Sequence, residues 1–297
     1  MASGQKGGNM TVVILGATGQ IGAYLQNCLV ANRAFNVRGT SRKGEAGTVK
    51  FDPYKDDWAT LGKIDVLINC IGCILESPNN SFEKVHQGLT SLIIKNREKV
   101  GNPRLIQVSV LGADEHSYSD FLRTKGLADK ELLSHKNSVV VRPSVVCTPG
   151  TVMIKKVRFL SEIAAYTFGW LPVPAGFPTH KLQPVMVDDL VWTIMHLCES
   201  NYCGVLEISG PEALSYKSLV KLLSQAKGRK IKLLEVPRSV ADPIIRNLLA
   251  VLVPKLISKG QYDLLFMDNI ASPEPAQALT GKRLSDTIPF WENEFSR

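Results

Sequence analysis

The sequence lacks a hydrophobic run long enough to span a bilayer, and residues 1–10 lack the apolar core of a secretory signal. It also lacks a basic run with interleaved aromatic residues, which argues against nucleic-acid binding although the net charge is +8. We therefore expect a flexible polar tail over 1–10 and no nucleic-acid partner. The expected location is the cytoplasm or, after removal of a targeting segment, an organelle matrix.

Patterns for metal binding and nucleophilic catalysis are missing as well. The five histidines show no ligand spacing with one another, and there is no Ser-His-Asp order or nucleophile elbow. The six cysteines are scattered in apolar contexts, which is typical of reduced core residues. Cys70 and Cys73 have redox-motif spacing, but Cys70 falls inside a predicted strand, whereas such a motif normally opens a helix. We expect no metal site and no redox pair.

The sequence does contain short apolar strands that alternate with amphipathic helices. Strands are predicted at 11–15, 36–41, 48–51, 65–71, 104–110, 138–141 and 205–209, and helices at 20–31, 80–100, 120–134, 188–199 and 216–226. This alternation predicts an α/β fold with a doubly wound, Rossmann-type parallel sheet. We expect a dinucleotide-binding core over 11–150, then returning core elements and a smaller, mainly helical C-terminal lobe over 151–297.

The first predicted strand runs into a glycine-rich loop that opens the first helix. In this pattern Gly16 permits a tight turn, Gly19 lets a pyrophosphate approach the backbone, and Gly22 lets the helix pack closely on the sheet. The N–H groups and partial positive charge at the start of the helix would then hold the phosphates. The candidate phosphate-binding residues are Gly16, Thr18, Gly19, Gln20, Ile21 and Gly22.

The end of the second strand indicates which dinucleotide is bound. An acidic residue there would hydrogen-bond the ribose hydroxyls of NAD, but the sequence reads Ser41-Arg42-Lys43. A hydroxyl and two cations suit a 2′-phosphate, so NADP is favoured and NAD is the alternative. Asp52, after the third strand, is a candidate for the adenine amino group. Ile71-Gly72 ends the fourth strand, where backbone must pass close to the cofactor.

The region expected to carry catalysis departs from a known pattern. Ser109 closes the fifth strand, and Phe121-Leu-Arg-Thr-Lys125 begins twelve positions later. Here the sequence resembles the short-chain dehydrogenase/reductase superfamily, in its extended or atypical branch, whose members carry Ser and then Tyr-x-x-x-Lys. The resemblance implies that Lys125 holds the nicotinamide ribose and that Ser109 hydrogen-bonds on the cofactor side. The proton-donating Tyr is Phe121 in this sequence, and a phenyl ring has no proton to give. Tyr118 is a candidate substitute acid if the preceding turn is helical.

Shorter motifs narrow the resemblance to proteins related to the nucleotide-binding accessory subunit of respiratory complex I, a group with free bacterial relatives. The matching stretches are 111–114, 121–125, 141–144, 183–189, 209–212, and Gln261 with Asp268-Asn269. This resemblance implies that Pro143 and Ser144 lie at a strand end beside the nicotinamide. Asp188 and Asp189 precede a helix, and an N-cap and first-turn role is favoured over acid/base chemistry.

Three functions remain open from the sequence. The first is an NADP-dependent oxidoreductase that acts on a small carbonyl or quinone-like substrate through an unusual acid. The second is a cofactor-binding structural or assembly protein, which Phe121 favours, and the third is a nucleotide-sensing regulator. The segment 244–257 is apolar but too short to span a membrane, and Pro254 interrupts it. Packing against the lobe is favoured for it, and docking on a protein complex or a membrane surface is the alternative.

Overall fold

The computed structural model describes residues 9–149, 151–245 and 259–296. The chain forms two compact units, and each is assembled from separate stretches of sequence. The first comprises Met1–Ser117, Leu122–Arg142 and Val191–Leu206, and the second comprises Tyr118–Phe121, Pro143–Leu190 and Glu207–Arg297.

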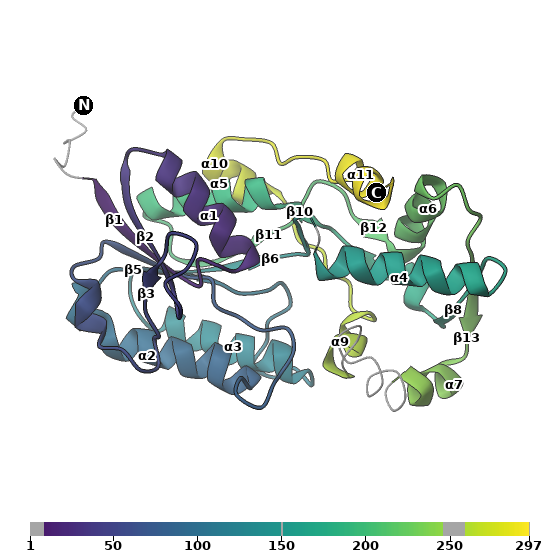
Figure 1. Ribbon diagram of the computed structural model, residues 1–297, viewed down its shortest axis with the longest axis horizontal. Coiled ribbons are helices and arrows are strands. Elements are labelled where there is room, and N and C mark those ends of the chain that lie inside the picture. Colours follow the sequence, from purple (N-terminus) through teal and green to yellow (C-terminus); the bar gives the residue numbers. More distant parts are fainter. Residues whose placement is uncertain (1–8, 150, 246–258, 297) are drawn as a thin grey trace. The chain divides into compact units, whose positions relative to one another are not determined.

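The first unit is built on a seven-stranded sheet with the order β11-β6-β5-β4-β1-β2-β3 (Figure 1). Its strands are β1 (Met10–Leu15), β2 (Phe35–Ser41), β3 (Val49–Lys50), β4 (Val66–Asn69), β5 (Arg104–Val108), β6 (Ser138–Pro143) and β11 (Gly204–Ile208). The neighbouring pairs from β3 across to β6 are all parallel. The predicted doubly wound fold is confirmed. The strand order reverses between β1 and β4, and such sheets bind ligands outside the carboxyl ends of the strands at that point.

Helices cover both faces of this sheet. α2 (Leu89–Asn96) and α3 (Asp120–Leu133) lie on one face, and α1 (Gln20–Ala31) and α5 (Val187–Glu199) lie on the other (Figure 1). The last four residues of β1, Val12 to Leu15, are fully buried because both of their faces are covered. Leu89 and Ile93 of α2 pack with Val13 and Leu15 in one apolar cluster, so the sheet fixes the position of the loop that follows β1.

The predicted helix over 80–100 is less regular than its periodicity indicated. Helical turns begin at Phe82 and pass through a π-helix at Lys84–Gly88 before α2, and a 3-10 turn at Arg97–Val100 follows. Asn80 instead forms a bridge with Ser77. A search for a 3.6-residue period assumes a regular helix, so it does not detect a wider turn.

Two strands end earlier than predicted. β4 ends at Asn69 and β5 at Val108, whereas the predicted strands ran to residues 71 and 110. Cys70 therefore follows β4 and does not lie inside it, which corrects the placement behind the redox reasoning. Cys70 and Cys73 are both free thiols, and burial raises the pKa of Cys70 to about 12, so its thiol is a poor nucleophile at neutral pH.

The second unit consists mainly of helices. They are α4 (Val152–Tyr166), α6 (Tyr216–Ala226), α7 (Arg238–Pro243), α9 (Lys259–Leu264), α10 (Glu274–Thr280) and α11 (Ile288–Ser296). Three two-stranded sheets accompany them, which are β7 (Val146–Cys147) with β10 (Val185–Met186), β9 (Lys181–Leu182) with β12 (Leu214–Ser215), and β8 (Trp170–Pro174) with β13 (Lys232–Val236). Trp291 and Phe295 of α11 pack with Leu219 and Leu223 of α6 in the core of this unit.

The apolar segment at 244–257 falls almost entirely outside the described residues, so its predicted docking role stays a prediction. Over the ranges that the structure does describe, no helix combines the length and hydropathy needed to cross a membrane.

Candidate functional site

The loop between β1 and α1 depends on the absence of side chains. Gly16 has a φ of +80°, and a Cβ on it would lie 2.8 Å from Cγ1 of Ile71. A Cβ on Gly22 would lie 2.2 Å from the carbonyl oxygen of Gly16, far inside van der Waals contact. The start of α1 is therefore packed directly on the end of β1, as the glycine spacing predicts.

Gly19 occupies the N-cap position of α1 and has no side chain to accept a hydrogen bond from the first-turn N–H groups. Its own N–H donates to the carbonyl oxygen of Gly16 at 3.0 Å, which closes the turn. Thr18, Gly19 and Gln20 are exposed, and Ile21 is half-buried. The exposed start of the helix thus offers N–H groups and partial positive charge to an anionic ligand.

The residues expected to set nucleotide selectivity begin at Ser41, the last residue of β2, which pairs with β1. Ser41 Oγ lies 2.7 Å from Thr48 Oγ1 and accepts a hydrogen bond from the N–H of Gly44 at 2.9 Å, so its hydroxyl supports its own loop. Arg42 and Lys43 are exposed. The two cations, and not the serine hydroxyl, are the groups that this strand end presents to a ligand.

The loops after β3 and β4 hold the other candidate cofactor residues. Asp52 Oδ1 accepts a hydrogen bond from the N–H of Tyr54 at 3.1 Å, so this carboxylate stabilises a turn. The N–H of Ile71 donates to Asn69 Oδ1 at 3.0 Å, which bends the chain just beyond β4. Gly72 is exposed, and a Cβ on it would lie 3.3 Å from Lys125 Nζ. Gly72 and Lys125, which the sequence assigned separately to the cofactor, are therefore neighbours.

Lys125 is buried on α3, where its Nζ donates a hydrogen bond to the carbonyl oxygen of Val108 at 3.2 Å. Burial lowers the pKa of the ammonium group, and the carboxylate of Asp129 opposes that shift. The side chain thus reaches the ends of β4 and β5 at once. A ribose hydroxyl beside Gly72 would find a hydrogen-bond donor there.

Ser109 takes part in a buried ion-pair network. Its Oγ donates to Asp129 Oδ2 at 2.8 Å, and Arg142 Nε donates to the same oxygen at 2.9 Å. Burial raises the pKa of Asp129, whereas the hydrogen bond from Ser109 and the charge of Arg142 lower it. The hydroxyl expected on the cofactor side is therefore directed to a carboxylate on α3.

Sequence reasoning missed Asp129 and its polar neighbours. Gln107 Nε2 donates to Asp129 Oδ1 at 3.2 Å, and Thr90 Oγ1 donates to Gln107 Oε1 at 2.7 Å. A signal was present, because Asp129 follows Lys125 by one helical turn and therefore lies on the same face of α3. Gln107 lies between two apolar residues in a fully buried strand, and such burial is unusual for an amide.

His86 is another buried group that the sequence did not distinguish from surface histidines. It comes from the π-helix, where Nδ1 lies 2.9 Å from Thr124 Oγ1 of α3 and Nε2 lies 3.2 Å from the carbonyl oxygen of Cys73. Burial and then the charge of Lys125 lower its pKa to about 3, so the ring is neutral at physiological pH. His86 joins the loop after β4 to α3, and these two segments carry Gly72 and Lys125.

The substitute acid proposed from the sequence lies outside any helix. Tyr118 belongs to a bend before α3 and is fully exposed, so the helical turn on which its candidacy depended is not formed. Ser117 and the residues after it turn toward a helix that begins only at Asp120. Phe121 does lie on α3, four residues before Lys125 and one turn away along the helix.

Pro143 and Ser144 lie in the second unit. Pro143 ends β6, and the N–H of Ser144 donates to the carbonyl oxygen of Ile208 at 2.9 Å. Ser144 Oγ donates to Asn269 Oδ1 at 2.5 Å, so the hydroxyl is bonded to the motif near the C-terminus that the sequence singled out. This contact makes Ser144 a structural link within its unit.

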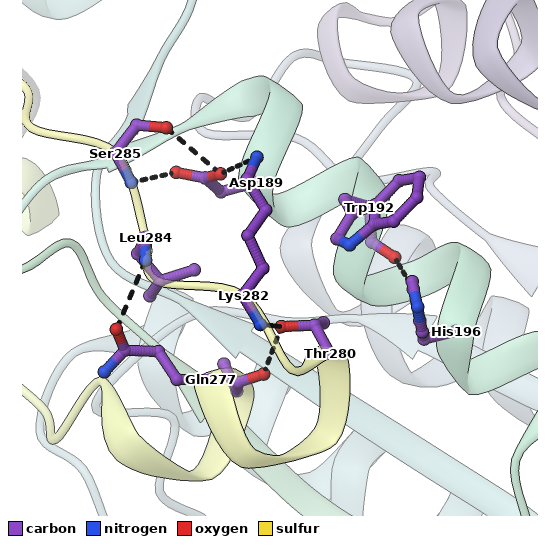
Figure 2. Close-up of polar contacts among 9 residues, drawn as sticks. Asp189, Trp192, His196, Gln277, Thr280, Lys282, Leu284 and Ser285 are labelled. Atoms are coloured by element: carbon purple, nitrogen blue, oxygen red, sulfur yellow. Dashed lines mark hydrogen bonds and ion pairs between the residues drawn. The ribbon is translucent and has the colours of Figure 1, made fainter.

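Asp189 has a wider role than the first-turn position expected for it. It lies in the first turn of α5, as predicted, but it is buried and its carboxylate accepts hydrogen bonds from a distant segment (Figure 2). The donors are the N–H of Ser285 at 2.6 Å and Lys282 Nζ at 3.2 Å. Asp188 is exposed. Farther along α5, His196 Nδ1 lies 2.9 Å from the carbonyl oxygen of Trp192, an ordinary helical contact (Figure 2). Asp189 therefore anchors the loop after α10, and a capping role alone does not describe it.

Across the described ranges, no group of three or more His, Cys, Asp or Glu side chains is arranged to hold a metal ion.

Comparison with known proteins shows similarity to subunits of mitochondrial NADH dehydrogenase. The chain is 30% identical over 235 residues to NADH dehydrogenase (ubiquinone) 1 alpha subcomplex subunit 9, mitochondrial, of Arabidopsis thaliana. That alignment covers 72% of this chain and 57% of the plant protein, so the chain spans little more than half of that relative. It is 24% identical over 284 residues to the mitochondrial NADH-ubiquinone oxidoreductase 40 kDa subunit of Neurospora crassa, covering 90% of this chain and 73% of that subunit. No protein-family model matches the chain.

Solved structures with the same fold are epimerases and related enzymes. UDP-glucuronic acid 4-epimerase from Bacillus cereus, solved with UDP-glucuronic acid and NAD, aligns with a TM-score of 0.70 and 16% identity over 96% of this chain and 98% of its own. A human epimerase family protein, solved with NADPH, aligns with a TM-score of 0.69 and 21% identity over 97% of this chain and 99% of its own. At these identities the likeness shows the fold.

Proposed function

This chain has the short-chain dehydrogenase/reductase fold and resembles subunit 9 of mitochondrial NADH dehydrogenase, and we propose that it is a nicotinamide-dinucleotide-binding accessory protein. The observation that carries the proposal is the open start of α1. Gly19 leaves the first-turn N–H groups without a capping side chain, and Gly16 and Gly22 allow close backbone approach.

NADP(H) is the dinucleotide that the residues favour. The exposed cations Arg42 and Lys43 follow β2 at the place where NAD-binding proteins carry a carboxylate. The related folds were solved with NAD in one case and NADPH in the other, so the preference rests on this chain's own residues. When bound, the nicotinamide would supply hydride chemistry, and Lys125 Nζ beside Gly72 would hold its ribose.

The accessory role is favoured over carbonyl reduction by the state of the three expected catalytic positions. Phe121 has no acidic proton to donate, Tyr118 is exposed outside α3, and the Ser109 hydroxyl donates its hydrogen bond to Asp129. General-acid catalysis contributes about 100- to 10,000-fold, so a dinucleotide bound here would react slowly with simple ketones and aldehydes. Reduction of a quinone-like substrate is the second candidate, and a nucleotide-sensing role is the third.

We propose that the physiological partner is a protein complex of the respiratory type and that the protein works in an organelle matrix. The relatives in Arabidopsis and Neurospora are mitochondrial subunits by name, which supports both proposals. In this role the bound dinucleotide stabilises the first unit, because a ligand that binds only the folded state adds its binding free energy to stability.

The test begins with the protein as purified. Nucleotide released by heat is identified by mass spectrometry, and calorimetry compares NADPH with NADH. Turnover is then measured with aldehydes, ketones and quinones. Tight NADPH binding with negligible turnover supports the proposal, whereas turnover at an ordinary enzymatic rate would establish the oxidoreductase instead. If neither NADPH nor NADH binds, the assignment of the dinucleotide site is wrong.

A further inference from the structure

The turn between α4 and β8 in the second unit carries aromatic side chains in solvent. Tyr166 ends α4 and is 86% exposed, Phe168 is 98% exposed, and Trp170 at the start of β8 is 44% exposed. Large apolar groups placed together on a turn are costly in water and contribute nothing to the core. Their position therefore calls for a reason outside the folding of this unit.

The backbone at Phe168 adds a second observation. Phe168 has a φ of +52°, a left-handed conformation that suits Gly or Asn and is unfavourable for an aromatic residue. The turn is held in place by hydrogen bonds, since the N–H of Gly169 donates to the carbonyl oxygen of Ala164 at 2.7 Å and that of Trp170 donates to Thr167 at 3.0 Å. An exposed ring on strained backbone indicates a function.

Basic residues lie directly beside these rings. β13 pairs with β8 in parallel, so that Lys232 is opposite Trp170, and the N–H of Lys232 donates to the carbonyl oxygen of Gly169 at 2.7 Å. Lys232 Nζ sits 5.0 Å from the centre of the Trp170 ring. Figure 1 shows the end of α4 close to β8 and β13. We call Tyr166, Phe168, Trp170, Arg229, Lys230 and Lys232 the aromatic-basic tip.

The charge balance of the tip is positive. Arg229, Lys230 and Lys232 are exposed. The exposed carboxylate of Glu162 lies one helical turn before Tyr166 on α4. Glu235, farther along β13, accepts a hydrogen bond from the N–H of Gly176 at 3.0 Å and is thereby engaged at the other end of the strand. The aromatic rings are thus bordered by an excess of cations.

We propose that the aromatic-basic tip docks on the surface of an anionic lipid membrane. Trp and Tyr are favoured at the headgroup level, where their rings lie in the apolar boundary while their polar ends stay hydrated. Lys and Arg side chains reach the negative headgroups, and their aliphatic stems cover apolar surface. The three rings and three cations lie on one turn and the segment beside it, so apolar rings and positive charge would meet the headgroup layer together.

The experiment is co-sedimentation of the full chain with vesicles of phosphatidylglycerol and phosphatidylcholine in equal parts, compared with vesicles of phosphatidylcholine alone. We expect binding to the mixed vesicles that weakens as salt is added. Phe168→Asn should weaken binding about tenfold, from the apolar area withdrawn from the interface. Lys230→Glu should weaken binding to the mixed vesicles about thirtyfold, at the strength that each basic residue contributes near an anionic leaflet.

Matched controls separate docking from folding. Val30→Asn removes an apolar side chain that is 61% exposed on α1, and Lys136→Glu reverses an exposed cation of the first unit. Both should leave vesicle binding unchanged. Phe168→Asn should also raise the melting temperature by about 2 °C or more, because Asn tolerates a left-handed φ, so lost binding cannot reflect misfolding. Equal binding to both kinds of vesicle, no binding to either, or an equal loss in Lys136→Glu would overturn the proposal. NADPH affinity should stay constant in all four variants, so failure here is distinct from failure of the nucleotide site.

Discussion

Arg42 is the residue that we propose to set nucleotide selectivity. We predict that the protein binds NADPH more tightly than NADH and that Arg42→Asp narrows or reverses the preference, since a carboxylate there would repel a 2′-phosphate and accept ribose hydroxyls. A charge-assisted hydrogen bond contributes about 1.5–3 kcal/mol, or roughly ten- to a hundredfold in affinity. Calorimetry with both nucleotides measures this. Lys50→Asp, at an exposed position in the neighbouring strand β3, is the matched control. Equal affinities in the unmutated protein would contradict the assignment.

Phe121 stands at the position expected to donate the proton in carbonyl reduction, and it has no acidic proton. We predict very low turnover on simple ketones and aldehydes, and an increase of up to about 100-fold in Phe121→Tyr, which places a hydroxyl one turn from Lys125 on α3. Stopped-flow oxidation of NADPH follows the reaction. The double variant Phe121→Tyr with Lys125→Met controls for the lysine and should return the rate to baseline. A normal rate in the unmutated chain would mean that another group donates the proton.

Single residues also show which parts of the candidate site could be predicted from the sequence and which could not. The exposed cations after β2 could be predicted, because a turn at a strand end is local. The partner of Ser109 could not, because Asp129 is brought to it by the packing of α3 on β5. A hydroxyl near a strand end has the same sequence signature whether it faces a ligand or a buried carboxylate.

Among the elements, the junction of β1 and α1 contains one glycine expected to matter for binding and another expected to matter for stability. We predict that Gly19→Val remains folded but loses NADPH binding. Its φ is −76° and suits any residue, and its Cβ would meet only the carbonyl oxygen of Gly16 at 3.2 Å. Gly22→Ala should instead destabilise the protein by about 1–3 kcal/mol through overpacking. Urea unfolding and calorimetry on both variants give the two readouts. If folded Gly19→Val keeps full NADPH affinity, the phosphates do not bind at this loop.

The first turn of α5 offers a second prediction at this scale, because its two carboxylates have opposite environments. Asp189 is buried and bonds to Ser285 and Lys282, whereas Asp188 is exposed. Asp189→Ala should lower the free energy of unfolding by about 2 kcal/mol, since the N–H of Ser285 loses its acceptor. Asp188→Ala should change it by about 0.5 kcal/mol or less. Similar losses in both variants, by chemical denaturation, would indicate a shared capping role.

Elements with strong local signals were predicted closely. α1 and α6 have the bounds that their periodicity indicates, and α6 begins where Ser215 Oγ accepts a hydrogen bond from the N–H of Ser218. The π-helix at Lys84–Gly88 was not predicted. It is stabilised by contacts of His86 with α3 and with the loop after β4, and no local sequence pattern encodes these contacts. Tertiary packing thus decides the irregular elements, and these lie nearest to the candidate site.

At the scale of the whole molecule, the buried imidazole of His86 links stability to pH. Its pKa is about 3 in the folded protein against an ordinary value of 6.5. Above pH 6.5 the ring is neutral in both states and has no effect. Between pH 6.5 and about 3 the unfolded chain binds a proton that the folded chain does not. As the pH is lowered through this window, the free energy of unfolding therefore falls by up to about 1.4 kcal/mol per pH unit.

Denaturation at several pH values measures this slope. His86→Gln should reduce it across that window and lower stability at neutral pH, where the ring's hydrogen bonds are lost. The control His116→Gln alters an exposed ring and should keep the slope of the unmutated protein. Asp129, whose pKa is raised, acts in the opposite sense and is present in every variant, so only the difference between variants is interpreted. Parallel stability curves for His86→Gln and the unmutated chain would show that His86 is not the titrating group.

The interleaved course of the chain has a consequence for its biosynthesis. The first unit takes its last stretch from Val191–Leu206, which the ribosome makes only after the second-unit stretches Tyr118–Phe121 and Pro143–Leu190. A nascent chain of 150 residues would carry the glycine loop but lack β11, and the edge of β6 that this strand covers would be open to other strands. The candidate nucleotide site and the edge of its sheet are therefore completed at different times during translation. During that interval the edge of β6 is uncovered, so a bound nucleotide or a chaperone would protect the chain most against pairing with other strands.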